Sequence, residues 1–140
     1  MREVIRVFAA RFRDFVADRR SAKRFKVNLR CTVGLISNFP GAEGVRRNSA
    51  LEGQTGDVSA SGLCLMMPAV HIGGHYLTGA GTTLMILLEL PDGPILFDAT
   101  AMRHERIEQS ESQMNFLIGV RIKNMGKEDH DRFVNFVKEL

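Results

Sequence analysis

The sequence predicts a mainly β domain, a small antiparallel barrel with an amphipathic helix near each end of the chain. Apolar and polar residues alternate through several short runs, and Gly- and Pro-containing turns separate these runs. Helical spacing of apolar residues appears only near the two termini. With 140 residues, of which 44% are hydrophobic, the chain fits one globular core and leaves no room for a second full domain.

Residues 1–18 are predicted to form a helix that precedes the barrel, which would span residues 19–140. The apolar side chains of this segment follow one helical face: Val4, Ile5, Phe8, Phe12, Phe15 and Val16. This apolar face must be buried, either against the barrel of the same chain or against a second copy of the chain. Because a tethered helix should not leave this much apolar surface in water, we expect a homo-oligomer, at least a dimer.

The strands of the barrel are expected in five runs, namely residues 25–33, 63–67, 82–90, 95–107 and 113–123. Between two of them, Pro91-Asp92-Gly93-Pro94 has the composition of a tight turn, because proline presets φ and glycine accepts positive φ. Residues 38–56 are rich in Gly, Asn and Ser and show no periodicity, so most of this segment is expected to be a loop. Residues 71–81 are expected to form another flexible connection.

A second helix is predicted from about Lys127 to the C-terminus. Its apolar residues recur at the spacing of one helical face: Phe133, Phe136, Val137 and Leu140. Acidic residues in the first turns suit the positive end of the helix dipole: Glu128, Asp129 and Asp131. This helix should close the domain.

The net charge of +3 hides an asymmetry along the chain. Residues 1–30 contain ten Lys and Arg against three Asp and Glu, which gives +7, and the remainder contains nine against thirteen, which gives −4. The cationic character is therefore local. It argues for a basic site or patch and against a protein coated with charge for nucleic acid.

Cysteine content and hydropathy point to the cytoplasm. Cys31 and Cys64 both lie in apolar runs, which indicates buried free thiols in a reducing compartment. Arginines interrupt any apolar core of a secretory signal in the first 18 residues, and no apolar run approaches the ~20 residues that cross a bilayer.

Two short segments carry the chemistry that suggests a function. In the first, Arg19 to Lys26, five of eight residues are cationic, and Arg20 and Arg24 stand four apart. Arginine offers a planar fork of donors that suits phosphate oxygens and the O6/N7 edge of guanine. The second segment, Asp57 to Gly62, supplies a carboxylate that can accept from guanine N–H groups, a hydroxyl and a permissive glycine.

Arg-x-x-x-Arg at Arg20–Arg24, followed by Asp-x-Ser-x-x-Gly at Asp57–Gly62, resembles the paired signature of PilZ domains, which are bacterial receptors for cyclic di-GMP. Either motif alone is weak, and the two together in this order are fairly specific. The resemblance extends from about Arg19 to the C-terminus and includes Gly119-Val120-Arg121-Ile122, where Ile122 replaces the usual aromatic residue.

The resemblance implies a six-stranded antiparallel barrel with a C-terminal helix and a role in binding rather than catalysis, with no cofactor besides the ligand cyclic di-GMP. It implies that Arg20 and Arg24 hold phosphate oxygens and a guanine edge, and that Asp57 and Ser59 contact the other guanine beside Gly62. Arg19 could add a guanidinium for an intercalated ligand dimer. The arginine segment is expected to act as a hinge that re-orients the N-terminal helix and signals to a downstream protein partner.

Other chemistry finds little support in the sequence. His71 and His75 are four apart but flank Gly73-Gly74, and no zinc-ligand motif occurs, so no metal site is expected. Nucleophile elbows and Walker loops are also absent, so no catalytic residue is predicted. Two alternatives stay open: a PilZ-like interaction module that binds no ligand, and a small basic nucleic-acid-binding barrel, which lacks the row of exposed aromatics that base stacking favours.

Overall fold

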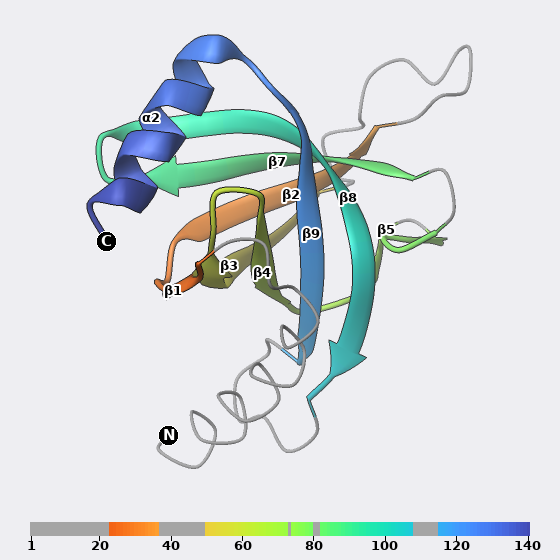
Figure 1. Ribbon diagram of the computed structural model, residues 1–140. Helices are drawn as coiled ribbons and strands as arrows, with labels where there is room; N and C mark the ends of the chain where they lie inside the picture. The colour runs from red at the N-terminus through yellow and green to blue at the C-terminus, as the bar shows by residue number, and fades with distance from the viewer. Residues whose placement is uncertain (1–22, 37–49, 73, 80–81, 108–114) are drawn as a thin grey trace.

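In the residues that the structure describes, the protein is a β-barrel with one helix packed against it (Figure 1). The computed structural model describes residues 23–36, 50–72, 74–79, 82–107 and 115–140. The helix predicted over residues 1–18 lies outside the described residues.

Six strands form the closed barrel: β2 (Arg30–Ile36), β3 (Ala50–Val58), β4 (Gly62–Met67), β7 (Thr83–Leu90), β8 (Gly93–Arg106) and β9 (Phe116–Met125). The order around the barrel is β3-β2-β7-β8-β9-β4, and β4 pairs back with β3, so the sheet has closed on itself. Every pairing is antiparallel. This confirms the predicted six-stranded antiparallel barrel, and closure removes the unpaired edges of an open sheet.

Alternation of side chains along the strands places the core inside the barrel. In β7 the inward-facing positions are all aliphatic and buried: Leu84, Ile86, Leu88 and Leu90. Leu87 and Glu89, between them, are exposed. The same period of two runs through the first part of β8, where Ile95 and Phe97 enter the core cluster. Burial of one face in β7 and in the first part of β8 fixes the register of these strands.

The run predicted as one strand over residues 25–33 is divided in the structure. It contains β1 (Phe25–Lys26) and the first part of β2, and both pair with β3. Lys26 pairs with Asp57 and Arg30 pairs with Gln54, so three residues (27–29) face only two (55–56). The extra residue is a bulge, which alternation of side chains alone does not reveal.

The prediction that most of residues 38–56 form a loop was wrong for residues 50–56, which belong to β3. β3 pairs with β2 on one side and with β4 on the other, so its place is fixed by its neighbours. Gly53 obscured the pattern, but it is required there: a Cβ atom would lie 2.5 Å from the Met66 carbonyl oxygen and still closer to the Met67 sulfur.

The connection after β4 also contains structure that was not predicted. β5 (His71–Ile72) and β6 (His75–Tyr76) form a two-stranded hairpin beside the barrel (Figure 1). Leu77 donates a backbone hydrogen bond to Val70, and both residues are buried. The hairpin is therefore attached to the core by its base.

The helix α2 (Lys127–Lys138) lies against one end of the barrel, beside β7 and β8 (Figure 1). Phe133 is fully buried and joins the core cluster together with Val137, as the helical spacing predicts. Polar contacts fix the helix to the β7–β8 turn: the Leu96 amide donates to the Asp129 carboxylate at 3.0 Å, and Arg132 donates to the Gly93 and Pro94 carbonyl oxygens.

Candidate functional site

The two motif segments meet where β1 runs beside the end of β3. Phe25 pairs with Val58 and Lys26 pairs with Asp57, so Arg24 leaves β1 next to the β3–β4 turn. On the other side of β3, Asp57 pairs with Cys64 of β4. Residues that stand 33 positions apart in the sequence therefore share one corner of the barrel.

Arg24 and Asp57 form an ion pair at this corner. The Arg24 Nη1 donates to Asp57 Oδ1 at 3.2 Å, and the side chains are 12% and 1% exposed, respectively. The Arg24 Nε is buried and has no hydrogen-bond partner within the described residues. One donor of the fork is thus engaged by the protein, and another is left for a further acceptor.

Ser59 and Gly62 form the turn that follows Asp57. The Ser59 amide donates to the Gly62 carbonyl at 2.9 Å, and the Ser59 hydroxyl donates to the same oxygen at 3.1 Å. That hydroxyl also accepts from the amides of Ser61 and Gly62 at 3.4 and 3.2 Å. Ser59 is buried, and these hydrogen bonds show that it shapes the turn. The sequence predicts a different role for it, contact with a ligand.

The turn is also joined to β9, since the Ile122 amide donates to the Ser61 carbonyl at 2.9 Å. Gly62 pairs with Arg121, whose exposed side chain adds a cation beside the turn. The sequence predicts Arg121 only as part of a strand, because its proximity to Gly62 depends on the pairing of β4 with β9. Arg19 and Arg20 lie outside the described residues.

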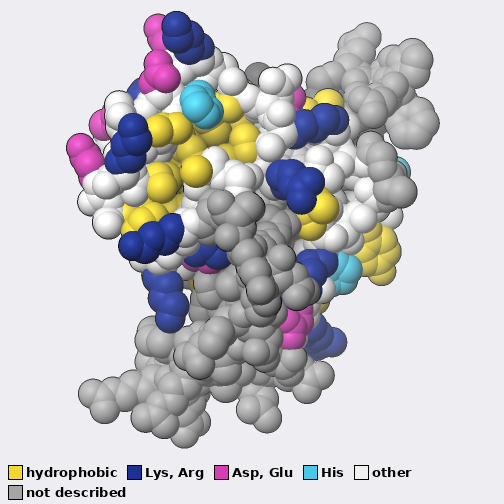
Figure 2. Space-filling view, in the orientation of Figure 1, with side chains coloured by type: hydrophobic (Ala, Val, Ile, Leu, Met, Phe, Trp, Pro, Cys, Tyr) yellow, Lys and Arg dark blue, Asp and Glu magenta, His cyan; other side chains and the backbone are white. Residues whose placement is uncertain are grey.

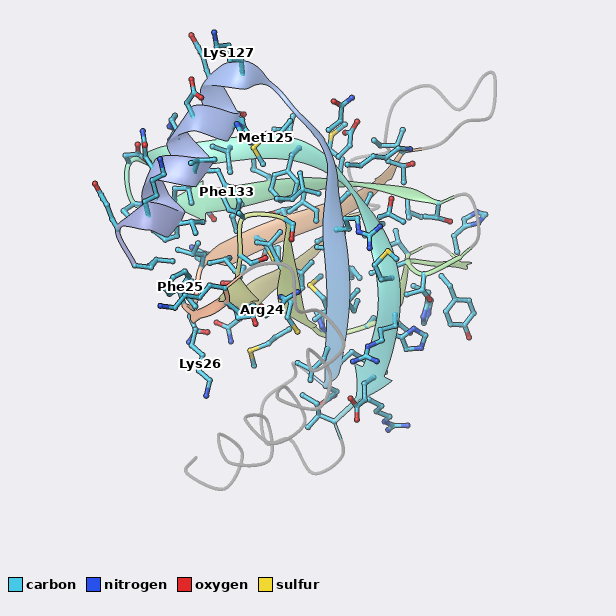
Figure 3. The ribbon with its side chains drawn as sticks, viewed as in Figure 1. Arg24, Phe25, Lys26, Met125, Lys127 and Phe133 are labelled. Carbon is cyan, nitrogen blue, oxygen red and sulfur yellow. The ribbon has the colours of Figure 1, made fainter. Side chains whose placement is uncertain are left out.

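The surface around the site combines cations with apolar side chains. On the face shown in Figure 2, an apolar area beside α2 is bordered by Lys and Arg side chains. Partly buried Phe25, Met125 and Phe136 pack against the core, and the Lys23 ammonium lies 5.3 Å from the centre of the Phe25 ring. In Figure 3, Arg24 lies toward the middle of this face and Lys26 points away from the barrel.

The remaining reactive groups do not form a second site in the part of the chain that the structure describes. Cys31 and Cys64 are buried and form no disulfide, as predicted, and burial raises the pKa of the Cys31 thiol to about 12. This thiol stays protonated at neutral pH and is a poor nucleophile. No three His, Cys, Asp or Glu side chains gather there as metal ligands. Within the described residues, no helix is long and apolar enough to cross a membrane.

Comparison with known protein families gives one match, to the PilZ domain, over residues 18–139. This range contains both motifs and all the described strands. No curated protein sequence matches the chain significantly.

Solved structures with the same fold have low sequence identity to the chain. The PilZ domain of YcgR from Escherichia coli, solved with c-di-GMP, has 14% identity and a TM-score of 0.61, with 88% of this chain and 92% of that one covered. The PilZ domain of CeSA from a cellulose-synthesizing bacterium has 15% identity and a TM-score of 0.54, with 84% and 96% covered.

A third neighbour is the inhibitor of motility MotI/DgrA from Bacillus subtilis, with 13% identity and a TM-score of 0.59. The alignment covers 87% of this chain and 50% of the Bacillus chain. The chain thus spans about half the length of that protein. At these identities, the similarity establishes the fold alone.

Proposed function

The chain belongs to the PilZ domain family, and on this premise we propose that it is a non-enzymatic receptor for cyclic di-GMP. The observation that carries the proposal is the Arg24–Asp57 contact, which brings the two separate motifs to one corner of the barrel. Membership of the family and the ligand in the Escherichia coli neighbour's structure support the choice of ligand. The local positive charge of residues 1–30 suits an anionic nucleotide.

In the proposed complex, Arg20 and Arg24 hold phosphate oxygens and a guanine edge. Asp57 accepts from a guanine, while Ser59 and Gly62 shape the turn that the ligand approaches, and Ser59 contacts the base if the turn opens. Arg19 adds a guanidinium and favours an intercalated ligand dimer. This arrangement is supported by the buried Nε of Arg24, which has no hydrogen-bond acceptor within the described residues, because a phosphate or base that reached it would supply one.

We propose that binding is transmitted through the chain that precedes β1. The segment from Arg19 to Arg24 acts as a hinge, and folding of this hinge onto the ligand re-orients the helix predicted over residues 1–18. That helix mediates homo-oligomerisation and, with the barrel, contacts a downstream protein partner. The protein is proposed to act in the cytoplasm, where its two cysteines, which form no disulfide, stay reduced.

Titration of the full chain with cyclic di-GMP by isothermal calorimetry tests the proposal. Arg20→Ala and Arg24→Ala should each weaken binding by about 2 to 5 kcal/mol. Each variant removes a guanidinium that pairs with the charge of the ligand's two phosphates, and leaves that charge partly unpaired. Arg24→Lys should also bind poorly, since an ammonium cannot make the bidentate contact. Arg106→Ala removes the same charge from an exposed position at the end of β8 and should bind as the wild type does.

Because Arg24 is a partner of a buried carboxylate, circular dichroism must first show that each variant is folded at the temperature of the titration. A flat titration of the wild type would refute the receptor and leave the interaction module. Equal affinity of wild type and Arg24→Lys would show that charge suffices without the fork. Binding of single-stranded nucleic acid, with cyclic di-GMP unable to compete, would favour the nucleic-acid-binding barrel instead.

A further inference from the structure

Three polar or charged side chains are buried in the described part of the chain: Thr55, Asp57 and Ser59. Two of them belong to the motif already discussed. Thr55 precedes Asp57 by two residues on β3, and no motif singles it out. A polar side chain is buried at little cost only where it is hydrogen-bonded, so its partners show what it does.

The partners of Thr55 lie on the chain that follows the arginine segment. Its hydroxyl accepts from the Leu29 amide at 2.8 Å and donates to the Val27 carbonyl oxygen. Its backbone amide donates to the Leu29 carbonyl at 2.8 Å. The side chain therefore bonds both ends of the bulge of residues 27–29, where ordinary ladder hydrogen bonds are interrupted.

This contact determines how β1 continues from the bulge. With the bulge fixed on Thr55, Lys26 falls opposite Asp57 and Phe25 falls opposite Val58. Arg24 then leaves β1 where its Nη1 reaches Asp57 Oδ1 at 3.2 Å. Without the hydroxyl, the Val27 carbonyl and the Leu29 amide would lose their side-chain partner, and the two-residue strand β1 would lose its support.

We propose that Thr55 is a positioning residue for ligand binding: its hydroxyl holds the 27–29 bulge so that Arg24 faces Asp57. The inference rests on the proposed function and deepens it, because it names a residue that acts on affinity without touching the ligand. The same hydroxyl also limits how far the proposed hinge can extend, since the chain from Val27 onward is fixed to β3.

The first test compares three variants by calorimetric titration with cyclic di-GMP, at a temperature where circular dichroism shows each to be folded. Thr55→Val keeps the shape and removes the hydroxyl, and affinity should fall about tenfold or more. Thr55→Ser restores the hydroxyl and should return to within about threefold of wild type. Ile95→Val trims the core on β8, away from the bulge, and should lower the melting temperature without a change in affinity.

If Thr55→Val binds as tightly as the wild type, the inference is wrong. The inference is also wrong if Ile95→Val lowers the melting temperature as much as Thr55→Val does and weakens binding to the same extent. The loss of affinity would then reflect stability alone. Should Thr55→Val fail to fold, Thr55→Ala takes its place with the same expected loss.

A second measurement needs no ligand and separates this inference from the proposed function. Amide hydrogen exchange should be faster at residues 24–29 in Thr55→Val than in wild type, with no change in β7 or β8. A flat titration of the wild type, together with this local change, would refute the receptor and leave the positioning of Arg24 intact. Unchanged exchange at residues 24–29 would overturn the inference whatever the titration shows.

Discussion

The Arg24–Asp57 pair is nearly withdrawn from solvent, and this distinguishes it from an ordinary surface ion pair. Its side chains are 12% and 1% exposed, so both charges were largely desolvated on folding. A buried pair of this kind is weak evidence for stability, because the cost of desolvation offsets most of the attraction. Within the described residues, the buried Arg24 Nε has no hydrogen-bond acceptor, and the proposed ligand contact would account for this.

The motif residues were chosen from the sequence by residue type and spacing, and the structure brings Arg24 of one motif into contact with Asp57 of the other; their contact with a ligand stays a prediction. Thr55 could not be predicted in this way, since one threonine in a Gly-containing segment carries no signal until the bulge that it bonds is known. The hydrogen bonds of Ser59 to the backbone of its own turn could not be predicted either, because they depend on the geometry of the turn, and its contact with a ligand stays a prediction.

Close packing around Gly53 leaves no room for a Cβ atom at that position. Gly53→Ala should destabilise the fold by about 1 to 3 kcal/mol, because the new methyl group would overlap the Met66 carbonyl and the Met67 side chain. Gly126 is a control for packing: an added Cβ there meets nothing within 4 Å, so Gly126→Ala should cost only the N-cap preference for glycine over alanine, about 0.5 kcal/mol. Chemical denaturation of both variants measures the difference. Equal midpoints would show that β4 moves aside freely.

At the scale of elements, prediction succeeded where one face of an element is apolar and the other polar. β7 and α2 were found nearly at their observed bounds because alternation and helical spacing are complete in each. β3 was missed because pairing with two neighbours holds it, and its glycines and polar residues follow no apolar pattern. The bulge after β1 was missed for a related reason, since it is defined by the register of β3.

The attachment of α2 to the β7–β8 turn should depend on pH. Arg132 donates to both carboxylate oxygens of Asp92, at 3.4 and 3.1 Å, and this hydrogen bonding lowers the pKa of Asp92 below its ordinary value of 3.8. A carboxylate with a lowered pKa in the folded state stabilises the fold above the unfolded pKa and loses that effect as pH falls through the folded pKa. The contribution should be full at pH 6, begin to fall as pH approaches about 3.8, and be lost only as pH drops through the lower pKa that Asp92 has in the folded state.

Thermal melts of wild type and Asp92→Asn between pH 6 and pH 3 test this. At pH 6 the wild type should have a higher melting temperature than Asp92→Asn. This gap in melting temperature should close as Asp92 becomes protonated. It should also narrow in high salt, because the Asp92 side chain is 68% exposed. Glu52→Gln replaces an exposed carboxylate on β3 and should show no such gap. A difference in melting temperature that stayed constant from pH 6 to pH 3 would mean that the carboxylate charge is not what fixes the helix.

At the scale of the whole molecule, the closed barrel and the cationic N-terminal part of the chain have different roles. The closed sheet, with Phe133 of α2 packed into its core, is a rigid support that needs no partner for its edges. The site lies where the cationic N-terminal part of the chain joins this support. A ligand bound there would contact both the fixed strand β3 and the chain that precedes β1, so its binding energy can act on that chain.

The chain that precedes β1 is expected to mediate self-association. An amphipathic segment with three phenylalanines on one face, tethered by a short cationic hinge, should associate with a second copy rather than expose its stripe. The intact chain should therefore sediment as a species at least twice its mass of 15.6 kDa at tens of micromolar, roughly the range in which weak interfaces are populated. Phe8→Asp/Phe12→Asp should dissociate it, and Met102→Asp, at an exposed position on β8, should not. A wild type that is monomeric under these conditions would exclude this assembly and leave the barrel of the same chain as the cover for the stripe.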